Sequence, residues 1–272
     1  MTQRNFEISV AGWSYHREIW SGRLQSIDAF ERVREELGLG AFELVNTLLE
    51  VPTARYVDRL AAASASHQVE VPLILCDGEG DLGAADADDR SRAIRNHTKW
   101  IWIAADLGCR AIRVNWKGVT QAELEGGIFD DFIHRSVASL HELLEISQRF
   151  EVDIVVENHG GPSSDPDLLV RLMEAVDAPG FGSLPDFGNF PPDTDRYAAV
   201  EAMMPWAKAV SAKCYDFADD GKETTIDFER MLEICIDQHG YTGFVGVEFE
   251  GDRLPEREGT RACRDLLARL RE

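Results

Sequence analysis

The chain has 272 residues, of which 44% are hydrophobic, and it carries a formal net charge of −21. A surface this acidic repels phosphate, which argues against nucleic acid and anionic membranes as partners. No apolar run approaches the roughly 18 to 20 residues that a membrane-spanning helix needs. The first residues lack the basic and apolar regions of a signal peptide, and the five cysteines form no CxxC pair, so we expect a cytoplasmic protein with reduced thiols.

Short β-rich runs alternate with longer amphipathic runs along the whole chain. The predicted strands are residues 6–10, 42–45, 69–75, 111–115, 153–157, 182–186, 209–213 and 244–249. The helical patterns between them include residues 27–37, 88–107, 131–150, 166–175 and 225–239. Asp165 followed by Pro166 is typical of the start of a helix.

This alternation predicts a fold. A repeat of roughly 27 to 43 residues is typical of βα units, and right-handed crossovers between them give a parallel sheet. Eight such units close naturally into a ring, and no linker or break in composition divides the chain. We therefore predict one α/β domain, a (β/α)8 TIM barrel over residues 1–272, with a doubly wound open sheet as the alternative.

Three predicted strands carry a carboxylate near their C-terminal ends: Glu157, Asp186 and Glu248. Burial of a carboxylate at the end of an apolar strand is costly unless the group is paired, protonated or bound to a metal. The C-terminal ends of barrel strands meet at one mouth, so we expect these side chains to cluster there. Oxygen ligands without cysteine favour Mg²⁺ or Mn²⁺, and Zn²⁺ or Co²⁺ would suit the site if a histidine joined.

Four segments resemble the xylose isomerase-like barrels, a superfamily that includes ketose 3-epimerases, inosose dehydratases and the endonuclease IV branch. The segments are VVENHGG (155–161), LPDFGNF (184–190), AVSAKCYDF (209–217) and FVGVEFEG (244–251), with weaker support from FELVN (42–46) and LCDGEGDLG (75–83). The resemblance implies a divalent metal held by Glu157, Asp186 and Glu248. It also implies a histidine ligand two residues before Lys213, where this chain has Ser211.

Two interpretations of this departure remain open. Three carboxylates retain the metal, with water near Ser211 or His159 supplying the remaining ligands. Alternatively, the ammonium of Lys213 lies among the carboxylates and replaces the charge of the metal. Alternation along a strand places Ser211 and Lys213 on the same face, which fits either arrangement.

The resemblance to ketose epimerases implies that Glu157 and Glu248 act as an acid/base pair through an enediolate, with Asp186 as an orienting ligand. We therefore predict a divalent-metal-dependent isomerase or epimerase of a sugar or keto-sugar. The alternatives are a lyase or dehydratase of a keto-sugar, keto-polyol or keto-glycoside, and a non-catalytic sugar-binding barrel. The endonuclease branch fits poorly because the chain lacks its histidine-rich site and basic groove.

Further side chains are candidates for contact with the substrate. Lys213 is predicted to bind a substrate oxygen or to stabilise the enediolate, with a salt bridge as the alternative. His159 is a candidate proton shuttle or hydroxyl contact, with a hydrogen-bonded loop histidine as the alternative, and Glu43 is a candidate to contact the substrate or to orient neighbours. The aromatic candidates for an apolar wall are Trp13, His16 and Trp116.

The expected substrate is a neutral sugar or polyol. No basic cluster that would hold a phosphate is evident, although Arg113, Lys117 and Lys213 are candidates for that role. The glycines at 78, 80 and 83 match a dinucleotide fingerprint, but the acidic residues among them would repel a pyrophosphate, so we expect no nucleotide cofactor. The resemblance also implies a possible homo-oligomer.

Overall fold

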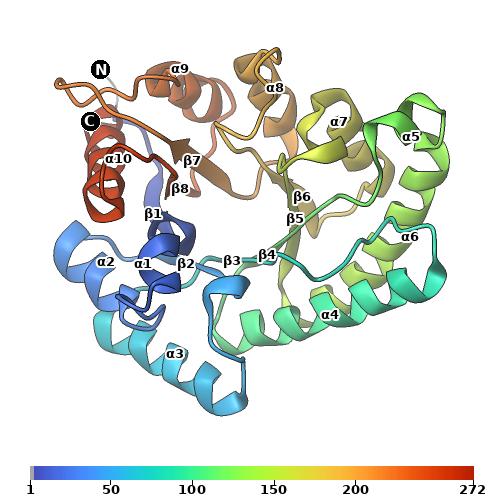
Figure 1. Ribbon diagram of the computed structural model, residues 1–272, viewed down its shortest axis with the longest axis horizontal. Helices are drawn as coiled ribbons and strands as arrows, with labels where there is room; N and C mark the ends of the chain where they lie inside the picture. Colours follow the sequence, from blue (N-terminus) through green and yellow to red (C-terminus); the bar gives the residue numbers. More distant parts are fainter. Residues whose placement is uncertain (1–2) are drawn as a thin grey trace.

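A ring of eight parallel strands surrounded by helices makes up the protein, whose computed structural model describes residues 3–272 (Figure 1). The strands are β1 (Glu7–Ala11), β2 (Phe42–Val45), β3 (Leu73–Leu75), β4 (Ala111–Val114), β5 (Asp153–Glu157), β6 (Phe181–Leu184), β7 (Val210–Cys214) and β8 (Phe244–Phe249). The α-helices are α1 (His16–Trp20), α2 (Ala29–Leu37), α3 (Ala54–His67), α4 (Ala87–Asp106), α5 (Gln121–Glu125), α6 (Phe129–Ser147), α7 (Pro166–Val176), α8 (Arg196–Met203), α9 (Phe228–Leu232) and α10 (Glu256–Arg271). The predicted (β/α)8 barrel is confirmed. None of the helices within residues 3–272 combines the length and apolar character that a membrane crossing requires.

The barrel closes through a weak seam between β6 and β7. Every other pair of neighbouring strands forms a parallel ladder, in the order β6-β5-β4-β3-β2-β1-β8-β7. At the seam, hydrogen bonds run from Ser211 N to Pro185 O (2.9 Å) and from Phe187 N to Ser211 O (3.0 Å). Pro185 has no N–H to donate, which limits a regular ladder at this position. The seam nevertheless places Asp186 directly beside Ser211.

Capping side chains explain where several helices begin. Asp165 accepts hydrogen bonds from the N–H groups of Asp167 and Leu168, and Pro166 occupies the first turn of α7, as the sequence predicted. The predicted helix 225–239 begins later, at Phe228, because Asp227 caps it. It then continues as a wider π-helical segment, Glu233–Gln238. The predicted strand 69–75 is shortened to β3, which follows Pro72.

Two apolar layers stabilise the barrel. The larger fills the space between the strands and the helices, and each fully buried aliphatic side chain there contributes roughly 1.5–3 kcal/mol. The smaller is formed by Leu48, from the turn after β2, and by residues that alternate inward along the strands, namely Ala11, Val45, Leu73, Leu75, Ala111, Val155 and Leu184. This inner layer supports the polar side chains at the C-terminal ends of the strands.

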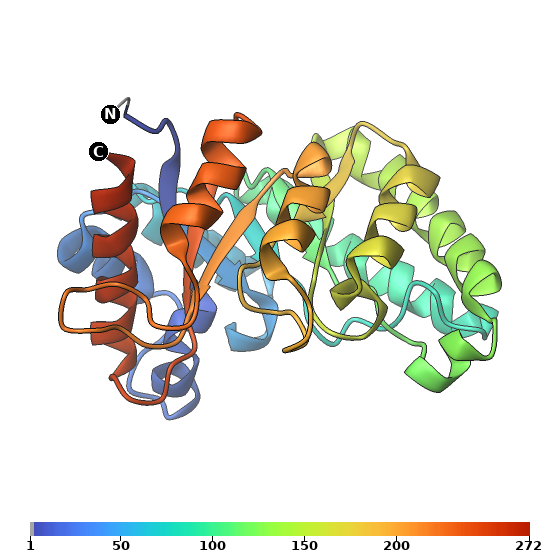
Figure 2. The same ribbon diagram turned by 90° about the horizontal axis from the view of Figure 1, so that it is seen from above.

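The first described residues lie beside the C-terminal helix. Figure 2 shows the N-terminal segment beside the end of α10. The backbone N–H of Arg4 donates to the carbonyl of Arg271 at 2.9 Å, so the first described residues lie against the last helix.

The fit of α10 against β8 depends on the lack of a side chain at Gly259. A Cβ there would lie 2.3 Å from Cε2 of Phe249. We expect Gly259→Ala to lower the free energy of unfolding by about 1–2 kcal/mol, because overpacking outweighs the gain in helix propensity. Chemical denaturation measures the change. In a Phe249→Leu background the same substitution should cost less, and an equal cost in both backgrounds would contradict this contact as the cause.

Candidate functional site

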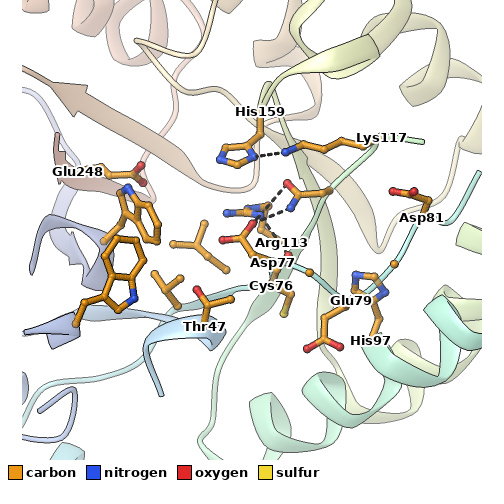
Figure 3. A pocket seen from close by; sticks show the side chains of 17 residues that line it. Thr47, Cys76, Asp77, Glu79, Asp81, His97, Arg113, Lys117, His159 and Glu248 are labelled. Carbon is orange, nitrogen blue, oxygen red and sulfur yellow. Dashed lines mark hydrogen bonds and ion pairs between the residues drawn. The ribbon is translucent and has the colours of Figure 1, made fainter. Parts of the chain in front are cut away.

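A cavity of about 640 Å³ opens at the C-terminal ends of the strands (Figure 3). One wall is aromatic, and the segment between β3 and α4 forms another side. The residues with polar or aromatic side chains that line it are Trp13, Trp20, Thr47, Asp77, Glu79, Asp81, His97, Arg113, Asn115, Lys117, His159 and Glu248. This is the end of the fold at which barrel enzymes place their active sites.

Three buried carboxylates cluster at the C-terminal ends of the strands, and one of them, Glu248, lines the cavity. Glu157 ends β5, Asp186 follows β6, and Glu248 lies in β8; one oxygen of each is within 4.8 Å of the others. The side chain of Asn158 binds the backbone of Asp186 twice, accepting from its N–H at 2.7 Å and donating to its carbonyl at 3.0 Å. Asn189 donates to Glu157 Oε1 at 2.8 Å. The segment after β5 therefore positions Asp186, and the segment after β6 positions Glu157.

A buried arginine holds one side of the cluster. Arg113, which points inward from β4, places Nε 2.9 Å from Glu157 Oε2 and Nη1 2.7 Å from Asp77 Oδ1. Asn115 also donates to Asp77 Oδ1, at 2.7 Å. The neighbouring Arg113 lowers the pKa of Asp77 to about 2, although burial acts in the opposite direction.

A buried lysine holds the other side. Lys213 of β7 is the register partner of Glu248 in β8, and its Nζ lies 2.8 Å from Glu248 Oε1 and 3.2 Å from Glu250 Oε2. Burial disfavours the ammonium, but the surrounding carboxylates, Glu248 foremost, raise the pKa of Lys213 above its usual value. The salt bridge predicted as one role of Lys213 is therefore present.

Negative charge nevertheless remains in excess. Five carboxylates, those of Asp77, Glu157, Asp186, Glu248 and Glu250, face two cations. Burial raises the pKa of Glu157 to about 8, with Arg113 opposing the shift. Burial likewise raises the pKa of Asp186 to about 6, against the effect of Lys213. Another positive charge or a shared proton would relieve this excess.

The donor set fits a hard divalent cation. Within residues 3–272, Asp186 Oδ2 and Ser211 Oγ are buried without a hydrogen-bond partner. Lys213 pairs with Glu248 and Glu250, so its ammonium leaves that oxygen of Asp186 unsatisfied. The cluster could therefore hold a metal ion, with an all-oxygen set of ligands that suits Mg²⁺ or Mn²⁺.

The aromatic wall comes from the segment after β1. Trp13 and Trp20 line the cavity, whereas His16 stacks behind Trp13 with ring centroids 4.7 Å apart. Trp13 donates through Nε1 to Glu250, which links the wall to the pair formed with Lys213. Trp20 is 61% exposed at the rim, and its ring meets that of Trp13 edge-on. Thus Trp13 lies where the sequence predicted, and His16 supports it from behind.

Trp116 is placed differently from the prediction. It is buried, stacks on Phe132 of α6 and donates from Nε1 to Ser136 Oγ at 2.9 Å. It therefore packs in the outer core instead of lining the cavity. Alternation along β4 accounts for this, because Arg113 points inward and residues at odd spacing from it point outward.

Glu43 also lies away from the cavity. It is the second residue of β2, is buried and accepts a hydrogen bond from Ser9 of β1. A Cβ at Gly246 would lie 2.5 Å from its Oε1, so the carboxyl group packs against β8 inside the barrel. It lines a separate cavity at the N-terminal ends of the strands. Glu43 is therefore a buried interior group in this structure.

His159 reaches the rim of the cavity beside Lys117. Its Nδ1 lies 3.1 Å from Lys117 Nζ, as Figure 3 shows. Burial, together with Arg113 and Lys117, lowers the pKa of His159 to about 4, so the ring is neutral near pH 7. Lys117 can only donate, and therefore the imidazole accepts at Nδ1 and carries its proton on Nε2.

Sequence reasoning missed several residues at the site. Glu250 follows Glu248 by two positions and so shares its face, and Asp77 follows β3 as Asp186 follows β6. Those signals were available. Asn189 and Trp20 lie in irregular segments or at a helix end, and no periodicity indicates where their side chains point.

Comparison with known proteins agrees with this architecture. The sequence model of the xylose isomerase-like TIM barrel family matches residues 30–271. The chain belongs to this family. No curated protein matches the sequence.

Solved structures share the fold at low sequence identity. A D-tagatose 3-epimerase-like protein aligns over 97% of both chains, with 18% identity and a TM-score of 0.77. The 3-keto-D-glucoside 4-epimerase YcjR from E. coli aligns over 98% of this chain and 99% of its own, with 19% identity and a TM-score of 0.76. The probable 3-DHS dehydratase AsbF from Bacillus anthracis aligns over 97% of this chain and 99% of its own, with 13% identity and a TM-score of 0.73. At these identities the likeness establishes the fold of this xylose isomerase-like barrel.

Glu43 should make stability depend on pH. Burial raises its pKa from 4.5 to about 7, with the Ser9 hydrogen bond opposing and Glu248 reinforcing the shift. The folded protein thus holds this proton more tightly than the unfolded chain, so the stabilisation is complete below pH 4.5 and is lost as pH rises through about 7. We expect Glu43→Gln to remove about 3 kcal/mol of the decline in unfolding free energy over that interval.

Urea denaturation at pH 5 and pH 8 measures this effect. Glu145→Gln, at an exposed position of α6, is the matched control and should follow the wild type. A decline that is the same in Glu43→Gln and the wild type would show that Glu43 does not hold the proton.

Lys213→Met should strengthen cation binding at the cluster. Removal of a buried positive charge from among the carboxylates leaves the excess negative charge larger. We expect Mn²⁺ to raise the melting temperature of the variant by more than that of the wild type, with EDTA as the reference. Lys208→Met, which removes a lysine paired with Asp153 at the opposite end of the barrel, is the control. Equal shifts in Lys213→Met and the wild type would mean that the ammonium does not compete with the ion.

Proposed function

We propose that the protein is a divalent-metal-dependent isomerase or epimerase of a sugar or keto-sugar. The observation that supports this most directly is the pair of carboxylates Glu157 and Glu248, which come from β5 and β8 and form one cluster with Asp186. A C–H bond beside a carbonyl is a weak acid. Two carboxylates that approach such a carbon from different strands can remove a proton on one side and return it on the other.

The surrounding residues hold these two groups in place. Glu157 is fixed by Arg113 and Asn189, so its orientation is set from β4 and from the segment after β6. Glu248 is fixed by Lys213 of the neighbouring strand. Arg113 opposes the rise of the Glu157 pKa to about 8, and a bound cation would favour the ionised form further, which a base that accepts a proton needs.

The metal would be held by Glu157, Asp186 and Glu248, with Ser211 Oγ as a further oxygen donor. Its contribution when bound would be to polarise the substrate carbonyl and to stabilise the enediolate charge. Asp186 has the role of an orienting ligand. Its Oδ1 accepts from the N–H groups of Gly188 and Asn189 at 2.8 Å each, and its Oδ2 is left without a partner in the described chain.

The cavity and the fold neighbours support a sugar as the substrate. Trp13 and Trp20 offer aromatic faces, which suit the C–H surface of a sugar ring, opposite polar side chains that can bind hydroxyl groups. Proteins with the same fold include a D-tagatose 3-epimerase-like protein and a 3-keto-D-glucoside 4-epimerase. Both names describe inversion at a carbon of a sugar or keto-glycoside, which fits the acid/base pair.

A lyase is the second candidate, and the position of Lys213 favours it. After a carboxylate removes the proton beside the carbonyl, the ammonium could protonate a departing β-hydroxyl group so that water leaves. Lys213 Nζ lies 2.8 Å from Glu248, within the same cluster as the proposed base. Product mass separates the two reactions, because an epimerase conserves the mass of the substrate and a dehydratase removes one water.

Exchange of substrate protons with solvent tests the proposal. With Mn²⁺ or Mg²⁺ in D₂O, we expect the protein to catalyse incorporation of deuterium beside the carbonyl of a ketose or 3-keto-glycoside. NMR measures the loss of the proton signal. Glu157→Gln and Glu248→Gln should each reduce the exchange rate by about 10²–10⁴, since each removes one member of the acid/base pair. Glu174→Gln, at an exposed position of α7, is the control and should exchange as the wild type does.

Two results would contradict the proposal. Exchange that persists in both variants would exclude these carboxylates as the acid and base. Binding of sugars without any exchange by the wild type across the panel would instead support a non-catalytic sugar-binding barrel.

A further inference from the structure

Three cations face the cavity or its base, and two of them are already paired. Arg113 is held by Asp77 and Glu157, and Lys213 is held by Glu248 and Glu250. Both are buried and both offset the negative charge of the carboxylates. Neither is therefore available to bind an anionic group of a ligand.

Lys117 is different. It lines the cavity and is half-buried, and among the described residues its ammonium has one hydrogen-bond partner, Nδ1 of His159 at 3.1 Å. No carboxylate oxygen lies within ion-pair distance of its ammonium in the part of the chain that the structure describes. The chain has 49 acidic residues against 28 basic ones, so an acidic partner would have been readily available by composition. A negatively charged ligand would supply the partner that Lys117 lacks among the described residues.

The two side chains together present only donors to the cavity. An ammonium has three N–H groups, and His159 accepts one of them. Because an ammonium can only donate, Nδ1 of His159 accepts from Lys117, and the ring proton lies on Nε2, from which it can donate. Figure 3 shows the ammonium of Lys117 and His159 directed toward each other, whereas Asp81 lies near the backbone after Lys117, its Oδ2 3.0 Å from where a Cβ at Gly118 would be.

Nearby acidic groups do not cancel this donor pair. Asp77 is bound to Arg113 and Asn115, and Glu79 is bound by Asn46, Lys99 and the indole of Trp100. Their charge is directed at those partners. The donors of Lys117 and His159 thus form a position where an anion would meet two or more N–H groups, while Asp77 and Glu79 nearby already accept from other donors.

We propose that Lys117 and His159 form a subsite for an anionic group, a carboxylate or a phosphate, carried by the substrate. This rests on the proposed function, because it places the reacting carbon at Glu157 and Glu248 and the anionic group at the rim. The substrate class is then an acidic sugar, a keto-uronate or a ketose phosphate. The sequence alone favoured a neutral sugar because it could not show which of the three cations was unpaired.

Binding measurements on matched ketoses test the subsite without any need for turnover. The two series are D-tagatose, D-tagaturonate and D-tagatose 6-phosphate, and D-fructose, D-fructuronate and D-fructose 6-phosphate. Members of a series differ only at C6, which is neutral, a carboxylate or a phosphate. Calorimetry gives Kd in metal-free buffer and again with Mg²⁺, and tryptophan fluorescence is a second readout because Trp13 and Trp20 line the cavity.

We expect the wild type to bind an acidic member about 10- to 100-fold more tightly than the neutral member, as charge-assisted hydrogen bonds would give. Lys117→Met should remove this preference and leave the affinity for the neutral ketose within about threefold, which also verifies a folded cavity. Lys117→Arg should restore part of it. Lys222→Met, which removes an exposed lysine from the surface, is the control for overall charge and should behave as the wild type.

The outcomes separate the two proposals. A carboxylate preference assigns a keto-uronate, and a phosphate preference assigns a ketose phosphate. Equal affinity for all members of both series, no binding of any member, or a preference that survives Lys117→Met would overturn the subsite. Preference for an acidic ketose without proton exchange would keep the subsite and refute the isomerase, whereas exchange on neutral ketoses with no anion preference would do the reverse.

Discussion

Excess negative charge at the mouth of the barrel is the constraint on which the site depends. Several carboxylates from different strands are buried together, and two buried cations, Arg113 and Lys213, offset only part of their charge. Ion pairs of this kind add little net stability, because desolvation consumes most of the Coulombic gain. The apolar layers around and inside the strands stabilise the fold instead.

The fold and the carboxylate cluster could be predicted because both depend on local patterns. Alternation within each strand and the regular βα repeat led to the barrel, and strand ends that share one mouth brought Glu157, Asp186 and Glu248 together. The sequence could not predict which ion-pair partner each charged side chain has. The sequence left Lys213 as either a metal substitute or a salt-bridge partner, and only register with β8 shows that it lies against Glu248.

The misplaced residues show two different limits. Alternation alone would have directed Trp116 outward, since Arg113 three positions earlier points inward. The prediction was wrong because it considered only that Trp116 lies near the end of a strand and not which face it occupies. Glu43 has the correct inward face. Its height along the barrel follows from the stagger between β1, β2 and β8, and that stagger pairs it with Ala11. Stagger is a property of the closed ring, which no single strand encodes.

The acidity of the whole chain changes how an anionic substrate would reach Lys117. A net charge of −21 repels anions at long range, so such a ligand gains no electrostatic steering from the surface. That repulsion is screened beyond roughly 10 Å at 0.1 M salt, whereas a contact with a half-buried ammonium is screened much less. Salt should therefore speed the association of an acidic ligand and weaken its bound contacts only slightly. Specificity for the anion would then come from the two donors Lys117 and His159 at the rim of the cavity, although the net negative charge of the protein repels anions.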